Sequence, residues 1–211
     1  MTPKESGNIL SFSSGILKPT VWFFGFALLL IVAHSLHAAG VTIITHGWQF
    51  GPFGPVGGTE APGWAYSMAD AILDRADGIA TRRTNYGSIY IHEPETGDWR
   101  APTTEEMSER LNNRVNSGST NEEIVLVYNW AQESDRLENG WLEAAADTLF
   151  ARLVNGPINL GIGNVLASGK TIHFIGHSRG AVLNALTVSR IGFWFPEVTV
   201  DHVTTLDPHP N

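Results

Sequence analysis

The fold is decided by residues 171–190, which read TIHFIGHSRGAVLNALTVSR. The run from Thr171 to Ile175 is apolar and rich in β-branched residues, as expected of a buried strand. The segment from Arg179 to Arg190 has the apolar spacing of a helix that buries one face. Only a few residues separate the two patterns, so the chain must turn sharply between them. The stretch therefore predicts a strand–turn–helix unit with Ser178 at the turn.

The turn itself has the pattern Gly-x-Ser-x-Gly, which between a strand and a helix is typical of a nucleophile elbow. In such a turn the serine backbone is strained, and neighbouring side chains would collide; Gly176 and Gly180 remove them. Ser178 would then lie at a helix start, where backbone N–H groups and the helix dipole favour an anion. The alternative is a tight turn in which Ser178 merely caps the helix.

Strand and helix patterns alternate on the N-terminal side of this unit. Apolar β-branched runs before the unit predict strands at Val41–Thr45 and Ile124–Tyr128. A similar run after the unit predicts a strand at Val198–Leu206. Apolar residues at helical spacing predict helices over residues 64–76 and 137–154. The inner face of the second helix is expected to carry Trp141, Leu142, Ala145, Leu149 and Leu153. The alternation predicts an α/β fold, a mostly parallel sheet with helices on both faces.

The region between the first two long strands has weaker patterns. Residues 78–93 predict a hairpin whose turn lies near residues 85–87, where Gly87 would supply a left-handed position. Farther along, Thr103 and Glu106 have the spacing of a capping box and predict a short helix.

Composition excludes several classes of function. A chain of 211 residues suits one domain, and its net charge of −8 argues against a nucleic-acid partner. There is no cysteine, which excludes disulfides, thiolate metal sites and a cysteine nucleophile. His92, His173 and His202 do not have the spacing of metal ligands, so we expect neither a metal nor a cofactor.

The N-terminus has the features of an export signal. Lys4 and Lys18 precede an apolar run over residues 21–33, and small residues follow at 38–40. The run is shorter than the roughly 20 residues of a membrane-spanning helix. We therefore expect residues 1–39 to be a signal peptide and the protein to be exported, secreted or periplasmic. An uncleaved N-terminal anchor is the alternative, and only this leader would contact a membrane.

The sequence from about residue 41 to 211 resembles the lipase and esterase branch of the α/β-hydrolase superfamily. The most specific likeness is GHSRG at 176–180 after the apolar strand. The segment ITHGW at 44–48 is similar to the His-Gly-aromatic segment that supplies an oxyanion donor in that family. VYNW at 127–130 resembles a strand end beside the site, and LDP at 206–208 follows the strand on which several lipases carry the triad acid.

This resemblance implies a catalytic role for each matching residue. Ser178 would be the nucleophile, Asp207 the acid, and the backbone N–H groups of Trp48 and Arg179 the oxyanion hole. Other family members carry the acid one strand later, and beside Pro208 the aspartate also suits a plain turn. Arg179 departs from the apolar residue usual after the serine. It would put a cation near the mouth of the site without disturbing the backbone donor.

The general base is the missing part of this set. In the family it is a histidine that follows the acid, and after Asp207 the chain has only His209, which is too close to Asp207 to reach Ser178 easily. His46 and His177 flank the site and are expected to be scaffold. We therefore expect residues 40–211 to be a partial domain, incomplete at its C-terminus. Its catalytic histidine would lie beyond residue 211, leaving this fragment inactive by itself.

The resemblance implies a serine hydrolase that cleaves a small-molecule or lipid carboxylic ester through an acyl-enzyme. An amidase, a thioesterase or a deacylase of lipid or glycan would use the same machinery. A non-catalytic binding protein that retains the fold is the third possibility. Residues 51–63, rich in glycine and proline, would border an acyl pocket, act as a lid or form a plain surface loop.

Overall fold

A computed structural model describes residues 40–49, 58–76, 87–116, 122–136, 140–156 and 163–209. The predicted leader, residues 1–39, lies outside these ranges. The described strands are β1 (Val41–Thr45), β2 (Gly87–His92), β3 (Trp99–Arg100), β4 (Glu123–Tyr128), β5 (Ile172–His177) and β6 (His202–Leu206). The helices are α2 (Gly63–Ala76), α3 (Thr104–Glu109), α4 (Ala131–Ser134), α5 (Trp141–Asn155) and α6 (Arg179–Trp194). None of these helices is long and apolar enough to cross a membrane.

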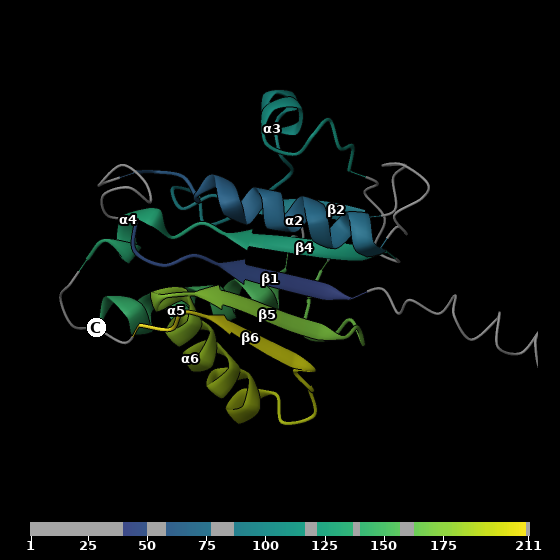
Figure 1. Ribbon diagram of the computed structural model, residues 1–211. Helices are drawn as coiled ribbons and strands as arrows, with labels where there is room; N and C mark the ends of the chain where they lie inside the picture. The colour runs from purple at the N-terminus through teal and green to yellow at the C-terminus, as the bar shows by residue number, and fades with distance from the viewer. Residues whose placement is uncertain are drawn as a thin grey trace, which may run out of the picture. The chain divides into compact units, whose positions relative to one another are not determined.

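The strands form one sheet in the order β3-β2-β4-β1-β5-β6. All neighbouring pairs are parallel except β2 and β3, which are antiparallel. The arrowheads of β4, β1 and β5 accordingly point the same way in Figure 1. The predicted mostly parallel α/β sheet is confirmed.

Helices cover both faces of the sheet, which is why its central strands are mostly buried along their length. On one face, Ile43 and Leu126 pack with Leu149 of α5 and Leu183 of α6. On the other, Ile44, Val125 and Val127 pack against α2, whose buried residues include Ala65, Ala69 and Leu73. The spacing of those three residues places them on a single stripe of the helix.

The hairpin predicted for residues 78–93 is wrong in the part that the structure describes. Strand β2 runs parallel to β4, and its antiparallel partner is the two-residue strand β3, reached by a turn at residues 93–98. Every residue of β2 is buried, as in an interior strand. The predicted turn failed because local sequence does not tell a strand which partner it will meet. Residues 77–86 lie outside the description.

Several predicted boundaries and one inner-face residue also change. Trp141 is the first residue of α5 and is 40% exposed, whereas Ala146 is buried in its place. The guanidinium carbon of Arg136 lies 5.4 Å from the Trp141 ring centre. Helix α6 extends to Trp194, and β6 begins only at His202.

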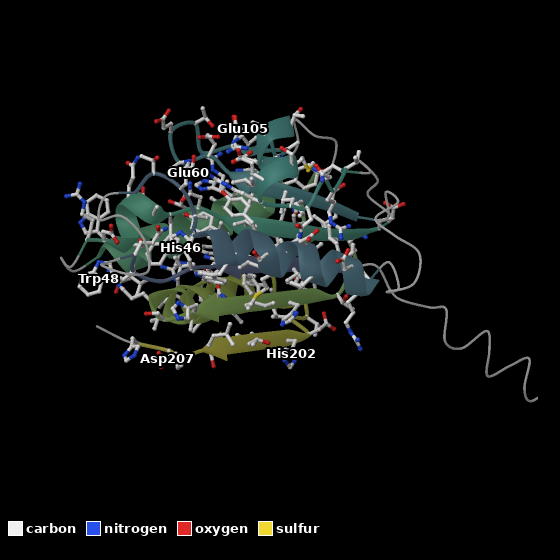
Figure 2. The ribbon with its side chains drawn as sticks, turned by 45° about the horizontal axis from the view of Figure 1, so that its top comes forward. His46, Trp48, Glu60, Glu105, His202 and Asp207 are labelled. Carbon is white, nitrogen blue, oxygen red and sulfur yellow. The ribbon has the colours of Figure 1, made fainter. Side chains whose placement is uncertain are left out.

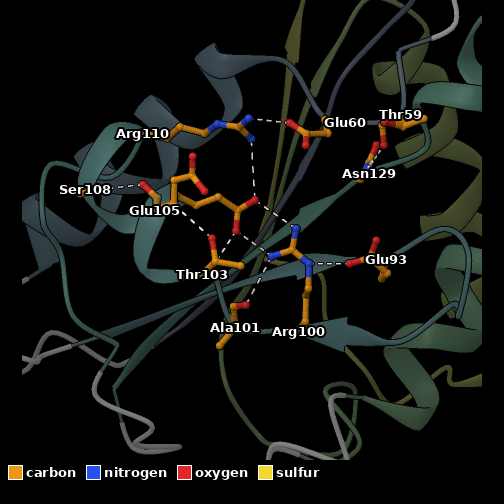
Figure 3. A network of polar contacts seen from close by, with 11 residues as sticks. Thr59, Glu60, Glu93, Arg100, Ala101, Thr103, Glu105, Ser108, Arg110 and Asn129 are labelled. Carbon is orange, nitrogen blue, oxygen red and sulfur yellow. Dashed lines mark hydrogen bonds and ion pairs between the residues drawn. The ribbon is translucent and has the colours of Figure 1, made fainter.

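The capping box predicted at α3 is confirmed, and it belongs to a larger ionic network (Figure 3). The Thr103 hydroxyl accepts from the Glu106 N–H at 3.2 Å, and the Glu106 carboxylate accepts from the Thr103 N–H at 2.8 Å. Arg100 donates to both Glu106 and Glu93. Arg110 donates to Glu60 at 2.6 Å, so α3 is tied to the segment that leads into α2.

Candidate active site

The junction of β5 and α6 is a sharp turn with a strained backbone at Ser178. Strand β5 ends at His177, α6 begins at Arg179, and Ser178 between them has φ 53° and ψ −125°. A non-glycine residue at such angles is strained by roughly 1–3 kcal/mol, a cost that persists only where the surrounding structure imposes it. The predicted strand–turn–helix unit is therefore present, with its strain at the predicted serine.

The two glycines of the turn are required by close packing. A Cβ on Gly176 would lie 2.6 Å from the Cα of Ala181, within the first turn of α6. A Cβ on Gly180 would lie 2.5 Å from the His46 carbonyl oxygen and 2.6 Å from that of Thr45. Both distances are to backbone atoms, which cannot rotate away. Any side chain at either position would therefore force β5 and α6, or β1 and α6, apart.

A third glycine brings the loop after β1 against Ser178. A Cβ on Gly47 would lie 2.4 Å from the Cβ of Ser178 and 2.9 Å from its Oγ. Strands β1 and β5 are neighbours, and β1 is also the strand from which the chain crosses to the β4 side. Ligands of open α/β sheets bind at such a switch point, beyond the carboxyl ends of the strands.

The backbone N–H groups of Ser178 and Arg179 differ in their hydrogen bonding. The Ser178 N–H donates to the Leu206 carbonyl at 2.9 Å and thereby extends the pairing of β5 with β6. The next N–H belongs to Arg179, the first residue of α6, and the first N–H groups of a helix have no intrahelical acceptor. The role of the Arg179 N–H as an oxyanion donor stays a prediction.

The second predicted donor, Trp48, follows Gly47 directly and is 39% exposed. Because Gly47 packs on Ser178, the segment that carries Trp48 lies beside that serine. Figure 2 shows Trp48 and Asp207 toward the end of the sheet at which the parallel strands finish. The role of the Trp48 N–H remains a prediction.

His46 is a neutral, buried part of the scaffold. Its Nδ1 lies 2.8 Å from the Gly47 carbonyl, which can only accept, so the ring hydrogen is on Nδ1. The Nε2 atom accepts from the Trp130 N–H at 3.4 Å, and the Trp130 indole donates to the His46 carbonyl at 2.8 Å. Burial lowers the pKa of His46 to about 4. Both ring nitrogens are therefore occupied away from Ser178.

The side chain of Arg179 does not place a cation at the mouth of the site, so that prediction is wrong. The residue is only 4% exposed, and its Nη1 donates to the carbonyls of Ser134 and Arg136, each at 2.7 Å. Burial lowers the pKa of this guanidinium. The side chain is directed to carbonyl groups at the end of α4 and at Arg136.

Asp207 lies beside the elbow, at the end of the neighbouring strand. His177 is paired with Leu206 in the β5–β6 register, so the residues that follow them, Ser178 and Asp207, leave the sheet side by side. Asp207 has φ 46° and is exposed. Its Oδ1 lies 3.6 Å from Nε2 of His209, too far for a hydrogen bond. The structure thus brings the predicted acid and His209 together at the predicted edge.

Two residues near the site, Gln49 and Trp64, were missed at the level of sequence. The Gln49 N–H donates to Asp135 at 3.1 Å, and its side-chain amide donates to the Glu60 carbonyl at 2.9 Å, so Gln49 holds the loop after β1. The Trp64 ring meets the His177 ring edge-on, with centres 5.6 Å apart. The only available signal was their closeness in sequence to the HGW segment and to the start of α2. Residues 50–57 of the predicted pocket or lid segment lie outside the description.

Neither a metal centre nor a known relative adds to this picture. Among the described residues, no three His, Asp or Glu side chains are grouped so as to hold a metal ion. Comparisons with protein-family models, curated proteins and solved structures find no match to this chain. The interpretation of the site therefore rests on its own geometry.

Proposed function

We propose that the chain is a serine hydrolase of carboxylic esters with Ser178 as its nucleophile. The observation that carries the proposal is the strained backbone at Ser178, cleared of side chains by Gly47, Gly176 and Gly180. A serine that merely caps a helix has extended backbone angles, and its hydroxyl accepts from the first turn. Ser178 has neither feature, since its φ is positive and its side chain makes no capping hydrogen bond.

The reaction follows from this placement. The Ser178 Oγ attacks the ester carbonyl carbon while a base takes its proton, and the resulting oxyanion accepts from the Arg179 N–H. The Trp48 N–H is the proposed second donor. Collapse of the tetrahedral intermediate breaks the ester C–O bond, and the base returns the proton to the departing alcohol. Water then attacks the acyl-enzyme in the same way and releases the carboxylic acid.

We assign the acid to Asp207, because a carboxylate there lies beside Ser178 and can orient an imidazole. The base in this proposal is a histidine outside the residues described, as the resemblance implies. His209, 3.6 Å from Asp207, is the alternative. His46 is not assigned, since its ring nitrogens contact Gly47 and Trp130. Free imidazole added to the solution would then take the place of that histidine in an assay of residues 1–211.

A fluorophosphonate probe tests the nucleophile directly. We expect slow labelling of the 211-residue chain at Ser178, accelerated by imidazole and abolished by Ser178→Ala. The matched control is Ser67→Ala, which removes an exposed hydroxyl on α2 and should label like the parent chain. A folded chain that imidazole does not render reactive would contradict the proposal. Ester turnover without imidazole that His209→Ala abolishes would instead make His209 the base.

A further inference from the structure

A cavity lies between the β2–β3 turn and helices α4 and α5, and its lining does not include Ser178. Its volume is about 360 Å³, within the range of small-ligand sites, and it is lined by His92, Tyr128, Glu133, Trp141 and Arg152 among others. His92 ends β2 and Tyr128 ends β4, so the cavity opens at the carboxyl edge of the sheet on the side remote from β5. None of these residues has a role in the proposed hydrolysis.

His92 contributes a hydrogen-bond acceptor that has no partner within the described residues. The residue is 3% exposed, and its Nδ1 lies 2.8 Å from the Asn129 carbonyl. A carbonyl only accepts, so the ring hydrogen is on Nδ1 and Nε2 keeps a bare lone pair. That Nε2 atom is buried and unpaired. Burial lowers the pKa of His92, which keeps the ring neutral and Nε2 an acceptor at neutral pH.

Two further acceptors line the same cavity. The Oε2 atom of Glu133 is buried and has no hydrogen-bond partner among the described residues. The Tyr128 hydroxyl donates its hydrogen to the Ala145 carbonyl at 3.2 Å, which leaves only lone pairs on its oxygen. Burial, reinforced by the charge of Glu133, raises the pKa of Tyr128 and keeps it neutral. Unpaired buried acceptors are costly, so the two unpaired atoms, with the Tyr128 oxygen as a further acceptor, favour a ligand rich in donors.

The charges around the cavity favour a cation. Glu95 and Glu133 line it, while the single lining cation, Arg152, lies 3.9 Å from the carboxylate of Asp98. The guanidinium also packs on the turn, because a Cβ on Gly97 would lie 1.9 Å from its Nη2. Arg152 is thus engaged at the turn, whereas the Glu133 oxygen is not compensated.

We propose that this cavity binds the ammonium group of a small primary amine. Three N–H donors on one cationic centre would serve the three acceptors His92 Nε2, Tyr128 Oη and Glu133 Oε2, and the positive charge would compensate the carboxylate of the half-buried Glu133, whose Oε2 is buried. The aromatic ring of Trp141 at the rim provides an apolar surface for the carbon chain. The inference does not depend on hydrolysis at Ser178.

Butylammonium chloride is the probe, titrated into the full chain while the imidazole ¹⁵N resonances are followed by NMR. We expect a saturable shift of the His92 Nε2 resonance, with a dissociation constant on the order of millimolar for so few atoms. Butanol, which has one donor and no charge, and tetramethylammonium, which has charge and no donor, should bind at least about tenfold more weakly.

Two variants locate the binding. Glu133→Gln keeps the shape and removes the charge, and Thr148→Trp fills the cavity from the exposed face of α5 without touching the three acceptors. Each variant should weaken the binding of butylammonium by about tenfold or more. Glu60→Gln is the control. Glu60 pairs with Arg110 in the network around α3 and does not line the cavity, so its replacement should leave the affinity for butylammonium unchanged. Absence of a His92 shift, equal binding of butanol or tetramethylammonium, or unchanged affinity in both cavity variants would overturn the proposal.

Discussion

The backbone angles of Ser178 are unfavourable for a serine. Three glycines permit the close packing that imposes these angles. Gly176, Gly180 and Gly47 each place backbone where a Cβ would collide with a neighbouring segment. The strain is therefore maintained by contacts from β1 and α6 and not by the pentapeptide alone. Substitution at one glycine should relax or break those contacts.

Gly180→Ala tests this dependence. The new methyl would lie 2.5 Å from the His46 carbonyl, so we expect a loss of roughly 1–3 kcal/mol in the free energy of unfolding, together with slower probe labelling at Ser178. Gly192→Ala in the same helix is the control. A Cβ there meets nothing within 4 Å, and alanine should stabilise the helix by about 0.5–1 kcal/mol. Urea unfolding measures both, and similar effects at the two positions would contradict the packing argument.

His46 predicts a pH dependence of stability. Its pKa is lowered to about 4 in the folded chain, against 6.5 for an ordinary histidine. Between these values the unfolded chain binds a proton that the folded chain does not, so stability falls as pH falls from about 6.5 to 4. The contribution is on the order of 3 kcal/mol. Urea unfolding of His46→Gln should show a flatter pH profile than the parent; parallel profiles would count against a buried neutral imidazole.

Among the elements, α3 shows how a short helix is held in place. It has only six residues, too few for a helix to persist without tertiary contacts or caps. The capping box of Thr103 and Glu106 satisfies its first N–H groups, and the ion pairs of Arg100 and Arg110 dock it on the sheet edge and on Glu60 (Figure 3). Sequence predicted the cap, while the ion pairs became visible only in three dimensions.

Thr103→Ala should remove one cap hydrogen bond. We expect a loss of about 1 kcal/mol in the free energy of unfolding, the usual effect of deleting an N-cap side chain. Thr104→Ala is the matched control, since Thr104 is the exposed neighbour just inside the helix and should change stability by less than about 0.5 kcal/mol. Thermal or urea unfolding distinguishes the two, and equal losses would remove the cap as the explanation.

At the scale of the whole molecule, the edge strand β6 differs from the interior of the sheet. Interior strands are buried on both faces, whereas β6 is exposed or half-buried along its length and pairs, among the described strands, only with β5. Val203 lies on it, and Phe193 and Trp194 at the end of α6 are also exposed. An edge strand with apolar residues and free backbone groups is a template for association.

Self-association of this chain should therefore depend on β6. We expect sedimentation to show concentration-dependent oligomers that Val203→Lys suppresses, because a lysine on an edge strand opposes pairing with a second edge. The control is Val115→Lys, which places the same charge at an even more exposed valine outside the sheet. A monomer at all concentrations, or equal suppression by both variants, would show that the edge is not the contact.

Features that depend on neighbours along the chain were predictable from the sequence. The strands at 41–45 and 124–128, the helix over 64–76 and the α3 cap follow from hydrophobic spacing and capping chemistry, which act within a few residues. The strained turn at Ser178 was predictable for the same reason, since Gly176 and Gly180 stand beside it. The parallel character of the sheet followed from the alternation of these elements.

Features that depend on distant segments meeting were decided only by the tertiary structure. The pairing of β2 with β4, the contact of Gly47 with Ser178 and the burial of the Arg179 side chain each join residues far apart in the chain. The exposure of Trp141 likewise depends on how α5 packs. Hydrophobic spacing indicates that a residue is buried against another segment, but it does not identify that segment. That choice is made when the whole core packs, because each segment then excludes the others from the space it fills.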